Sequence, residues 1–188
     1  MEQVEKKIDV IGVPGTREVP NNWPGNCFAC SPRNSMGLQM KMYYTPEGCG
    51  SRVVLRPEFC GFDGIAHGGI VATLLDEIAT WVLMIERSQL FVTSKANMSY
   101  YRPVPVGVPL IVEGRVTRTS RNQATTVSTI KNLDEVILAE CESSWITRGI
   151  DALAKIMGKP REYVKKLRRE FFDPIEEARK TSGGISYE

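Results

Sequence analysis

A long apolar segment is the feature that most constrains the fold of this chain. Residues 70–85 read IVATLLDEIATWVLMI, contain no Gly or Pro, and carry apolar side chains on nearly every side. A run of this length favours an α-helix over a strand. A helix that is apolar almost all round has to be buried on most sides. The segment therefore predicts a central helix around which other elements wrap.

Strand patterns lie on both sides of this segment in the sequence. Short turns separate consecutive strands, which predicts antiparallel pairing. The predicted strands cover residues 37–44, 51–56, 92–101, 109–119, 124–132 and 136–147. Strands, one buried helix and then a run of strands describe an α+β plan. We expect a curved antiparallel sheet wrapped round one long central helix.

Changes in composition divide the chain into three parts. Residues 1–26 are punctuated by Pro, Gly and Asn and are predicted to be an irregular lead-in. Residues 27–148 hold the predicted sheet and central helix. Residues 149–188 change to helical patterns and are predicted to form a C-terminal helical extension. Within it, Asp173 to Glu176 read as a helix start, with an N-cap, a Pro and a capping-box Glu.

Charge and histidine content exclude several kinds of function. The net charge of +2 over 188 residues is too small to indicate a nucleic-acid partner by itself. We see no secretory signal and no stretch that reaches the roughly 20 apolar residues of a membrane span. A cytoplasmic location without a membrane partner is therefore predicted. His67 is the only histidine, which excludes HExxH zinc centres within one chain.

The cysteines raise the question of a bound metal. They are Cys27, Cys30, Cys49, Cys60 and Cys141. An odd number in a chain without a secretory signal argues against a disulfide framework. Four thiolates could hold zinc, but a second CxxC motif is absent, which favours free or packed thiols. We predict no metal and no organic cofactor, and leave open whether the first four cysteines bind zinc.

The start of the central helix carries the candidate site. His67-Gly68-Gly69 leads directly into the apolar segment. The first amides of a helix lack intrahelical partners and lie at the positive end of the helix dipole. The Gly69 N–H is therefore suited to stabilising an oxyanion. Asp76 follows two turns later on the same face, where a carboxylate in an apolar helix is costly unless it is paired or used.

These residues resemble those of a known family. HGG followed after six residues by Asp, with Tyr100-Tyr101-Arg102-Pro103 about 25 residues further on, is similar to the hot-dog acyl-CoA thioesterases. The relatives concerned are phenylacetate-pathway thioesterases and mitochondrial thioesterase-superfamily members of mammals. Residues 26–38, with the pattern N-C-F-A-C-S-x-x-N-x-x-G-L, resemble the lead-in of bacterial members. The resemblance covers residues 26–147.

The resemblance implies a fold, an assembly and an activity. The fold is the hot-dog fold, in which an antiparallel sheet encloses a helix. The assembly is a homodimer with a continuous sheet, often paired again into a homotetramer, with the sites at the dimer interface. The activity is hydrolysis of acyl-CoA thioesters, so the expected partners are an acyl-CoA substrate and further copies of the chain.

The resemblance also implies roles for individual residues. The amide of Gly69, together with Gly68, binds the thioester carbonyl. Asp76 of the partner subunit attacks this carbonyl or activates a water molecule, and Thr93 orients the water or the carboxylate. The catalytic set is therefore Asp76, Gly69 and Thr93. The residues expected to contact the substrate are His67, Gly68 and Asn97.

Several alternatives stay open from the sequence. Glu77 could replace Asp76 as the base, although the spacing from HGG in the relatives favours Asp76. Gly61 stands where many phenylacetate-type enzymes carry Asn or Gln, so positioning of the water falls to Thr93. The chain could instead be a non-catalytic acyl-CoA-binding sensor. It could also be a hot-dog enoyl-CoA hydratase or dehydratase that uses His67 as its base.

Basic residues outside the motif have two interpretations. Residues 159–169 contain a run of Lys and Arg, and Arg118 and Arg121 lie near a predicted hairpin tip. Such positions are typical of a solvated surface. The alternative is contact with the phosphates of CoA or with an acidic carrier protein.

Overall fold

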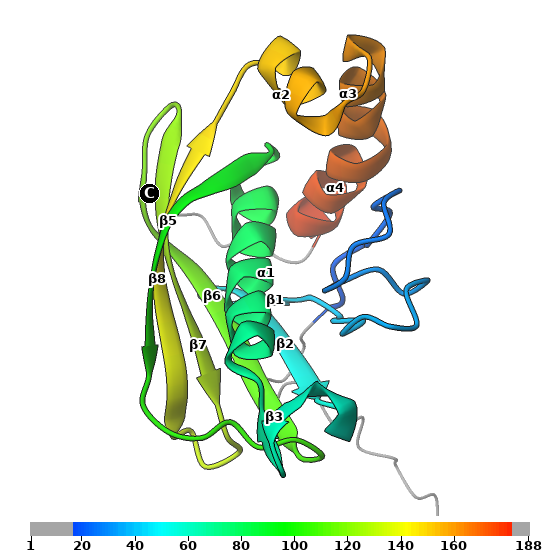
Figure 1. The fold of residues 1–188 in the computed structure, drawn as a ribbon. Helices are drawn as coiled ribbons and strands as arrows, with labels where there is room; N and C mark the ends of the chain where they lie inside the picture. Colours follow the sequence, from blue (N-terminus) through cyan, green and yellow to red (C-terminus); the bar gives the residue numbers. More distant parts are fainter. Residues whose placement is uncertain (1–16, 182–188) are drawn as a thin grey trace, which may run out of the picture.

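A six-stranded antiparallel sheet curves around one long helix in the computed structural model, which describes residues 17–181 (Figure 1). The helix, α1, spans Gly68–Arg87. The strands of the sheet lie in the order β1-β2-β6-β7-β8-β5, so β1 and β5 are the edge strands. The predicted α+β plan is confirmed.

The sheet is formed by β1 (Tyr43–Thr45), β2 (Gly48–Val54), β5 (Phe91–Tyr100), β6 (Pro109–Thr119), β7 (Gln123–Lys131) and β8 (Ile137–Thr147). The strands that follow α1 begin and end within about one residue of their predicted bounds, as expected for elements delimited by clear turn signals. Ahead of α1, a 3-10 turn, η1 (Pro57–Phe59), leads into a small second sheet of β3 (Cys60–Phe62) and β4 (Ile65–Ala66).

The predicted strand over residues 37–44 is wrong for most of its length, because only its last two residues join β1. Gln39 has a φ of 50°, which interrupts an extended backbone. The Leu38 N–H donates to the Phe28 carbonyl over 2.8 Å. The alternating pattern of this segment therefore reflects packing against the loop that contains Phe28 and Ala29, and not membership of the sheet.

The core lies between α1 and the sheet. The buried residues of α1 are Val71, Leu74, Leu75, Ile78, Ala79, Trp81, Val82, Leu83, Met84 and Ile85. Gly114 on β6 allows the helix to approach closely, since a Cβ there would stand 3.1 Å from the Ile78 carbonyl oxygen. Contrary to the sequence expectation, α1 is long and apolar enough to cross a membrane by length and composition. Its burial against the sheet is that of a core helix.

The C-terminal extension covers the side of α1 that faces away from the sheet (Figure 1). Its helices are α2 (Ile150–Met157), α3 (Arg161–Leu167), a π-helical turn η2 (Arg168–Phe172) and α4 (Asp173–Thr181). The Phe171 ring meets Trp81 of α1 edge-on at 5.6 Å between centroids, and Trp23 of the lead-in at 5.1 Å. Lead-in and extension therefore share one hydrophobic core with α1 and the sheet.

The predicted helix start at Asp173 is wrong, because the chain is already helical there. Asp173 has φ −60° and ψ −43°, which are helical values and not those of an N-cap. The π-helical turn η2 runs directly into α4. It widens the helix just before Pro174, whose missing N–H removes one hydrogen bond from the ladder.

Candidate active site

His67 caps the N-terminus of α1. Its backbone is extended, with φ −61° and ψ 138°, and its Nδ1 accepts the Gly69 N–H over 2.9 Å. The His67 carbonyl accepts the N–H groups of Ile70 and Val71 over 2.9 and 3.1 Å. The imidazole thus does for this helix what a Ser or Asp side chain does at most N-caps. Because Nδ1 is the acceptor, it carries no proton in this arrangement.

This cap changes which amide is available to a ligand. The Gly69 N–H, predicted as the oxyanion donor, is already bonded to His67 and is released only when that side chain turns away. For the Gly68 N–H, residues 17–181 supply no hydrogen-bond acceptor. The geometry therefore moves the outward-facing donor one residue earlier, to Gly68.

A pocket of about 290 Å³ lies beside Gly68 at the start of α1. It is lined by Ile65, Ala66, Gly68, Val71 and residues 100–104. The Tyr100 hydroxyl donates to the Gly68 carbonyl over 3.3 Å. The HGG motif and the Tyr-Tyr-Arg-Pro motif, which are far apart in the sequence, therefore form one wall of the same pocket.

Asp76 and Thr93 meet between α1 and β5. The Thr93 Oγ1 donates to the Asp76 Oδ1 over 2.9 Å. Asp76 is partly buried, whereas Thr93 is exposed on the edge strand. The second Asp76 oxygen has no hydrogen-bond donor within residues 17–181. The sequence placed these two side chains in one site, and the structure brings them together.

Asn97 lies on the opposite face of the sheet from Thr93. Thr93 pairs with the buried Trp145 of β8, whereas Asn97 pairs with the exposed Glu142. Without a bulge, residues four apart on a strand share a face. A register shift at Ser94 inserts one extra residue and reverses the alternation beyond it. Within one protomer, Asn97 is therefore not part of the predicted substrate site.

Glu77 points away from Asp76, because neighbouring residues on a helix lie about 100° apart. It accepts the Trp81 Nε1–H over 2.9 Å and faces Cys27, which lies in the loop before β1. Burial, followed by the nearby Cys27, raises the pKa of Glu77 to about 7. Of the two candidate bases, only Asp76 forms a hydrogen bond with Thr93.

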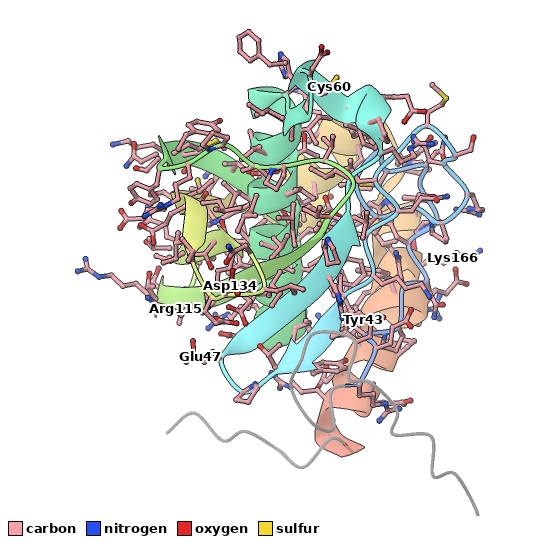
Figure 2. All side chains as sticks on the ribbon, turned by 90° about the horizontal axis from the view of Figure 1, so that it is seen from below. Tyr43, Glu47, Cys60, Arg115, Asp134 and Lys166 are labelled. Atoms are coloured by element: carbon pink, nitrogen blue, oxygen red, sulfur yellow. The ribbon has the colours of Figure 1, made fainter. Side chains whose placement is uncertain are left out.

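The four-cysteine zinc set considered from the sequence is not assembled. Cys60 is exposed at the periphery of the molecule (Figure 2). Across residues 17–181, the grouping of potential metal ligands is Cys27, Cys30 and Glu77. Sequence reasoning missed the carboxylate in this group. The CxxC motif indicated a possible ligand pair, but the sequence alone does not show that Glu77 lies opposite the two cysteines.

A curved antiparallel sheet around one long helix, with a helix carboxylate bonded to an edge-strand hydroxyl, defines a hot-dog protein with a potential hydrolytic site. Residues 63–139 match the family model of the thioesterase superfamily. This match, with the fold, confirms the predicted resemblance at the level of the superfamily. No curated protein matches the chain in sequence.

Solved structures with the same fold include thioesterase superfamily proteins. One has a TM-score of 0.60 and 22% identity over 64% of this chain and 60% of its own. A phenylacetic acid degradation-related protein of Ralstonia eutropha JMP134, described as a candidate thioesterase, has a TM-score of 0.55 and 20% identity. The match covers 62% of this chain and 91% of that protein. A Streptococcus mutans UA159 protein bound to acetyl-CoA has a TM-score of 0.54 and 21% identity. The match covers 58% of this chain and 89% of that protein. At these identities the likeness shows the fold alone.

Proposed function

We propose that the protein hydrolyses acyl-CoA thioesters to a free acid and CoA. The observation that carries this proposal is the 2.9 Å hydrogen bond from Thr93 to Asp76. It holds the carboxylate in one orientation and leaves its other oxygen to accept a proton from water. The superfamily match supports thioester hydrolysis in general. The acetyl-CoA bound to the S. mutans protein supports a CoA ester as the substrate class.

The proposed reaction is general-base hydrolysis. Asp76 takes a proton from a water molecule whose oxygen attacks the thioester carbonyl carbon. The carbonyl oxygen then carries negative charge, which the Gly68 N–H at the positive end of α1 stabilises. Collapse of this intermediate breaks the C–S bond. The departing sulfur receives the proton held by Asp76, so the carboxylate is restored and the products are an acid and a thiol.

Two protomers are needed to build this site. Gly68 and Asp76 are eight residues apart on one helix, a separation of about 12 Å along its axis, which is too far for both to act on one carbonyl. We infer that Gly68 of one protomer works with Asp76 of the partner subunit. The predicted homodimer supplies this arrangement, and a homotetramer stays a prediction.

The edge strand β5 supports the homodimer. It is ten residues long and largely exposed, and within residues 17–181 it pairs on one side only, with β8. A long strand with a free edge presents unpaired N–H and C=O groups to another chain. Antiparallel pairing of two copies about a two-fold axis would extend the sheet from one protomer into the next. It would also bring Thr93 and Asp76 to the interface.

A basic pocket supports CoA as the leaving group. It measures about 370 Å³ and lies between the end of α1 and the C-terminal extension. The cations that line it are Arg121, Arg148, Lys165 and Arg168. Within residues 17–181 none of the three arginines forms a salt bridge. Guanidinium groups without a carboxylate partner are well suited to binding phosphate. CoA carries phosphate groups, whereas a simple thiol does not.

The hydratase alternative receives less support from the geometry. Its base would be His67, but Nδ1 of that side chain is engaged in capping α1. The other candidate catalytic group of α1, Asp76, is positioned by Thr93 and not by a histidine. A non-catalytic sensor shares the same pockets and is distinguished by experiment.

A thiol-release assay with aryl-, short-chain and long-chain acyl-CoAs tests the proposal. Asp76→Asn should lower kcat by about 10² to 10⁴, the usual contribution of a general base. Glu142→Gln is the matched control, because this carboxylate is exposed on the other face of the sheet, and it should keep the wild-type kcat. Undiminished turnover by Asp76→Asn would refute the mechanism. Saturable CoA-ester binding without thiol release would indicate a sensor, and turnover of enoyl-CoA alone a hydratase.

A further inference from the structure

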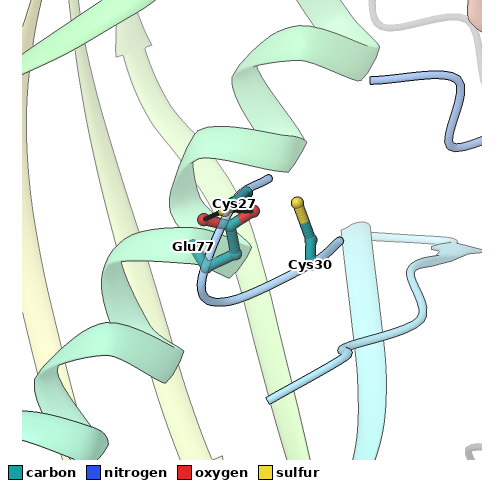
Figure 3. Close-up of side chains that lie close together, drawn as sticks. All are labelled: Cys27, Cys30 and Glu77. Carbon is teal, nitrogen blue, oxygen red and sulfur yellow. Dashed lines mark hydrogen bonds between the residues drawn. The ribbon is translucent and has the colours of Figure 1, made fainter. Parts of the chain in front are cut away.

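Two cysteines of the loop before β1 and one carboxylate of α1 form a cluster that the proposed hydrolysis does not use (Figure 3). The Sγ atoms of Cys27 and Cys30 and a carboxylate oxygen of Glu77 all lie within 4.8 Å of one another. The Cys27 Sγ is 3.8 and 3.7 Å from the two Glu77 oxygens. Ligands held at about 2.3 Å from a tetrahedral ion stand roughly 3.7 Å apart. The separation of Cys27 and Glu77 is therefore that of two ligands in one coordination shell.

The loop that carries the cysteines is built to direct them at one point. The Ser31 N–H donates to the Cys27 carbonyl over 3.2 Å, which closes the CxxC segment into a turn. The turn sets the Sγ atoms of both cysteines close to the Glu77 carboxylate.

Gly37 holds this turn in place from outside. A Cβ at position 37 would stand 2.1 Å from the Phe28 carbonyl oxygen, so only glycine fits there. The Leu38 N–H donates to that same carbonyl. Gly37 and Leu38 therefore stabilise the turn that carries Cys27 and Cys30 and holds them opposite α1.

The carboxylate is oriented in the manner of a metal ligand. The Trp81 Nε1–H donates to the Glu77 Oε1 over 2.9 Å, which fixes the plane of the carboxylate. Hydrogen bonds of this kind commonly position ligands in metal centres. Within residues 17–181, no Lys, Arg or His forms a salt bridge with Glu77. A cation at this cluster would therefore meet no competing basic side chain of the described residues.

We propose that Cys27, Cys30 and Glu77 bind one divalent cation of the zinc class, with solvent in the fourth position. Thiolate ligands select zinc over magnesium and calcium, which prefer oxygen alone. The ion would join the loop before β1 to α1 and so act as a structural clamp. This set differs from the four cysteines considered from the sequence, because Glu77 takes the place of Cys49 and Cys60.

Cobalt titration tests the site directly on the wild-type chain. The full-length protein, reduced and stripped with a chelator, should bind one Co²⁺ per chain with the intense thiolate charge-transfer band and the visible bands of a tetrahedral centre. Zn²⁺ should displace it. Cys27→Ser should abolish the band, and Glu77→Gln should weaken Zn²⁺ binding by about tenfold or more. Cys60→Ser, which removes an exposed thiol outside the cluster, should change neither.

The wild-type result does not depend on whether the variants fold. If the reduced chain shows no charge-transfer band and retains no Zn²⁺ after dialysis, the site does not exist. Cobalt binding that survives Cys27→Ser in a variant with wild-type circular dichroism places the metal elsewhere and also overturns the proposal. Oxidation of Cys27 and Cys30 to a disulfide in a chain that takes up no metal when reduced has the same consequence. None of these measurements depends on thioesterase activity.

Discussion

One imidazole decides which amides of α1 are available to a ligand. His67 occupies the Gly69 N–H, while Gly68 lines the pocket at the helix start and its N–H has no acceptor within residues 17–181. The positive end of the helix dipole therefore acts through the first residue of α1. His67, which was predicted to contact the substrate, instead caps α1. By engaging the Gly69 N–H, it leaves the Gly68 N–H as the available donor.

The role of the Gly68 amide can be tested by removing its hydrogen. Gly68→Pro deletes the N–H at the first helical position, where Pro is well tolerated, and the extended backbone of His67 already suits a following Pro. We expect kcat to fall by about 10² to 10³, the usual loss for an oxyanion donor. The comparison is Gly68→Ala, whose Cβ has no neighbour closer than 3.9 Å, at Tyr100. Equal kcat values for the two variants would contradict the assignment.

At the scale of elements, α1 separates two neighbouring carboxylates into two environments. Asp76 faces Thr93 on β5, whereas Glu77 faces the turn that carries Cys27 and Cys30. One helix can do this because successive residues diverge around its axis. The same rotation explains why Asp76 and Glu77, which are adjacent in the sequence, have different partners in the structure.

Local signals account for what the sequence predicted well. Periodicity and turn residues delimit α1 and the four strands after it, and these signals need no knowledge of distant partners. The bulge at Ser94 depends on pairing with β8, so the reversed face of Asn97 was hidden. The left-handed Gln39 and the meeting of Cys27 with Glu77 likewise arise from contacts between remote segments. The Asp76–Thr93 pair was found only through resemblance to a family.

The free edge of β5 predicts a concentration-dependent pattern of amide exchange. In a homodimer built through this strand, the β5 amides not bonded to β8 should be protected at high protein concentration and exchange faster on dilution. The β7 amides, which lie inside the sheet, should show no such dependence. Hydrogen exchange with mass-spectrometric readout, combined with sedimentation velocity, measures both. A dimer by sedimentation whose β5 amides stay unprotected would place the interface elsewhere.

At the scale of the whole molecule, the two ends of the described chain complete the core. Phe171 lies between Trp23 of the lead-in and Trp81 of α1, and its side chain is fully buried. The Arg179 guanidinium donates to the carbonyls of Ile85 and Glu86 near the end of α1, both over 3.3 Å. The helical extension therefore stabilises the helix that carries the candidate site.

Truncation of Phe171 measures how strongly the extension supports the fold. Phe171→Ala should lower the free energy of unfolding by about 3 to 5 kcal/mol, the usual cost of emptying a buried aromatic site. Ile156→Ala is the matched control: this side chain is 60% exposed on α2, and its loss should cost about 0.5 kcal/mol or less. Urea denaturation followed by tryptophan fluorescence gives both values. A loss below about 1 kcal/mol for Phe171→Ala would mean that the extension is only loosely attached.

The covering of α1 by the chain's own tail also restricts how larger particles can grow. With that flank closed by Phe171 and its neighbours, two dimers have no bare helix through which to stack back to back. The outer side of the sheet, where Asn97 and Glu142 lie opposite each other, carries no such cover from Phe171 or its neighbours. The bulge that turns Asn97 away from Thr93 thus places it on the outer side of the sheet, where we expect the contacts of the predicted homotetramer.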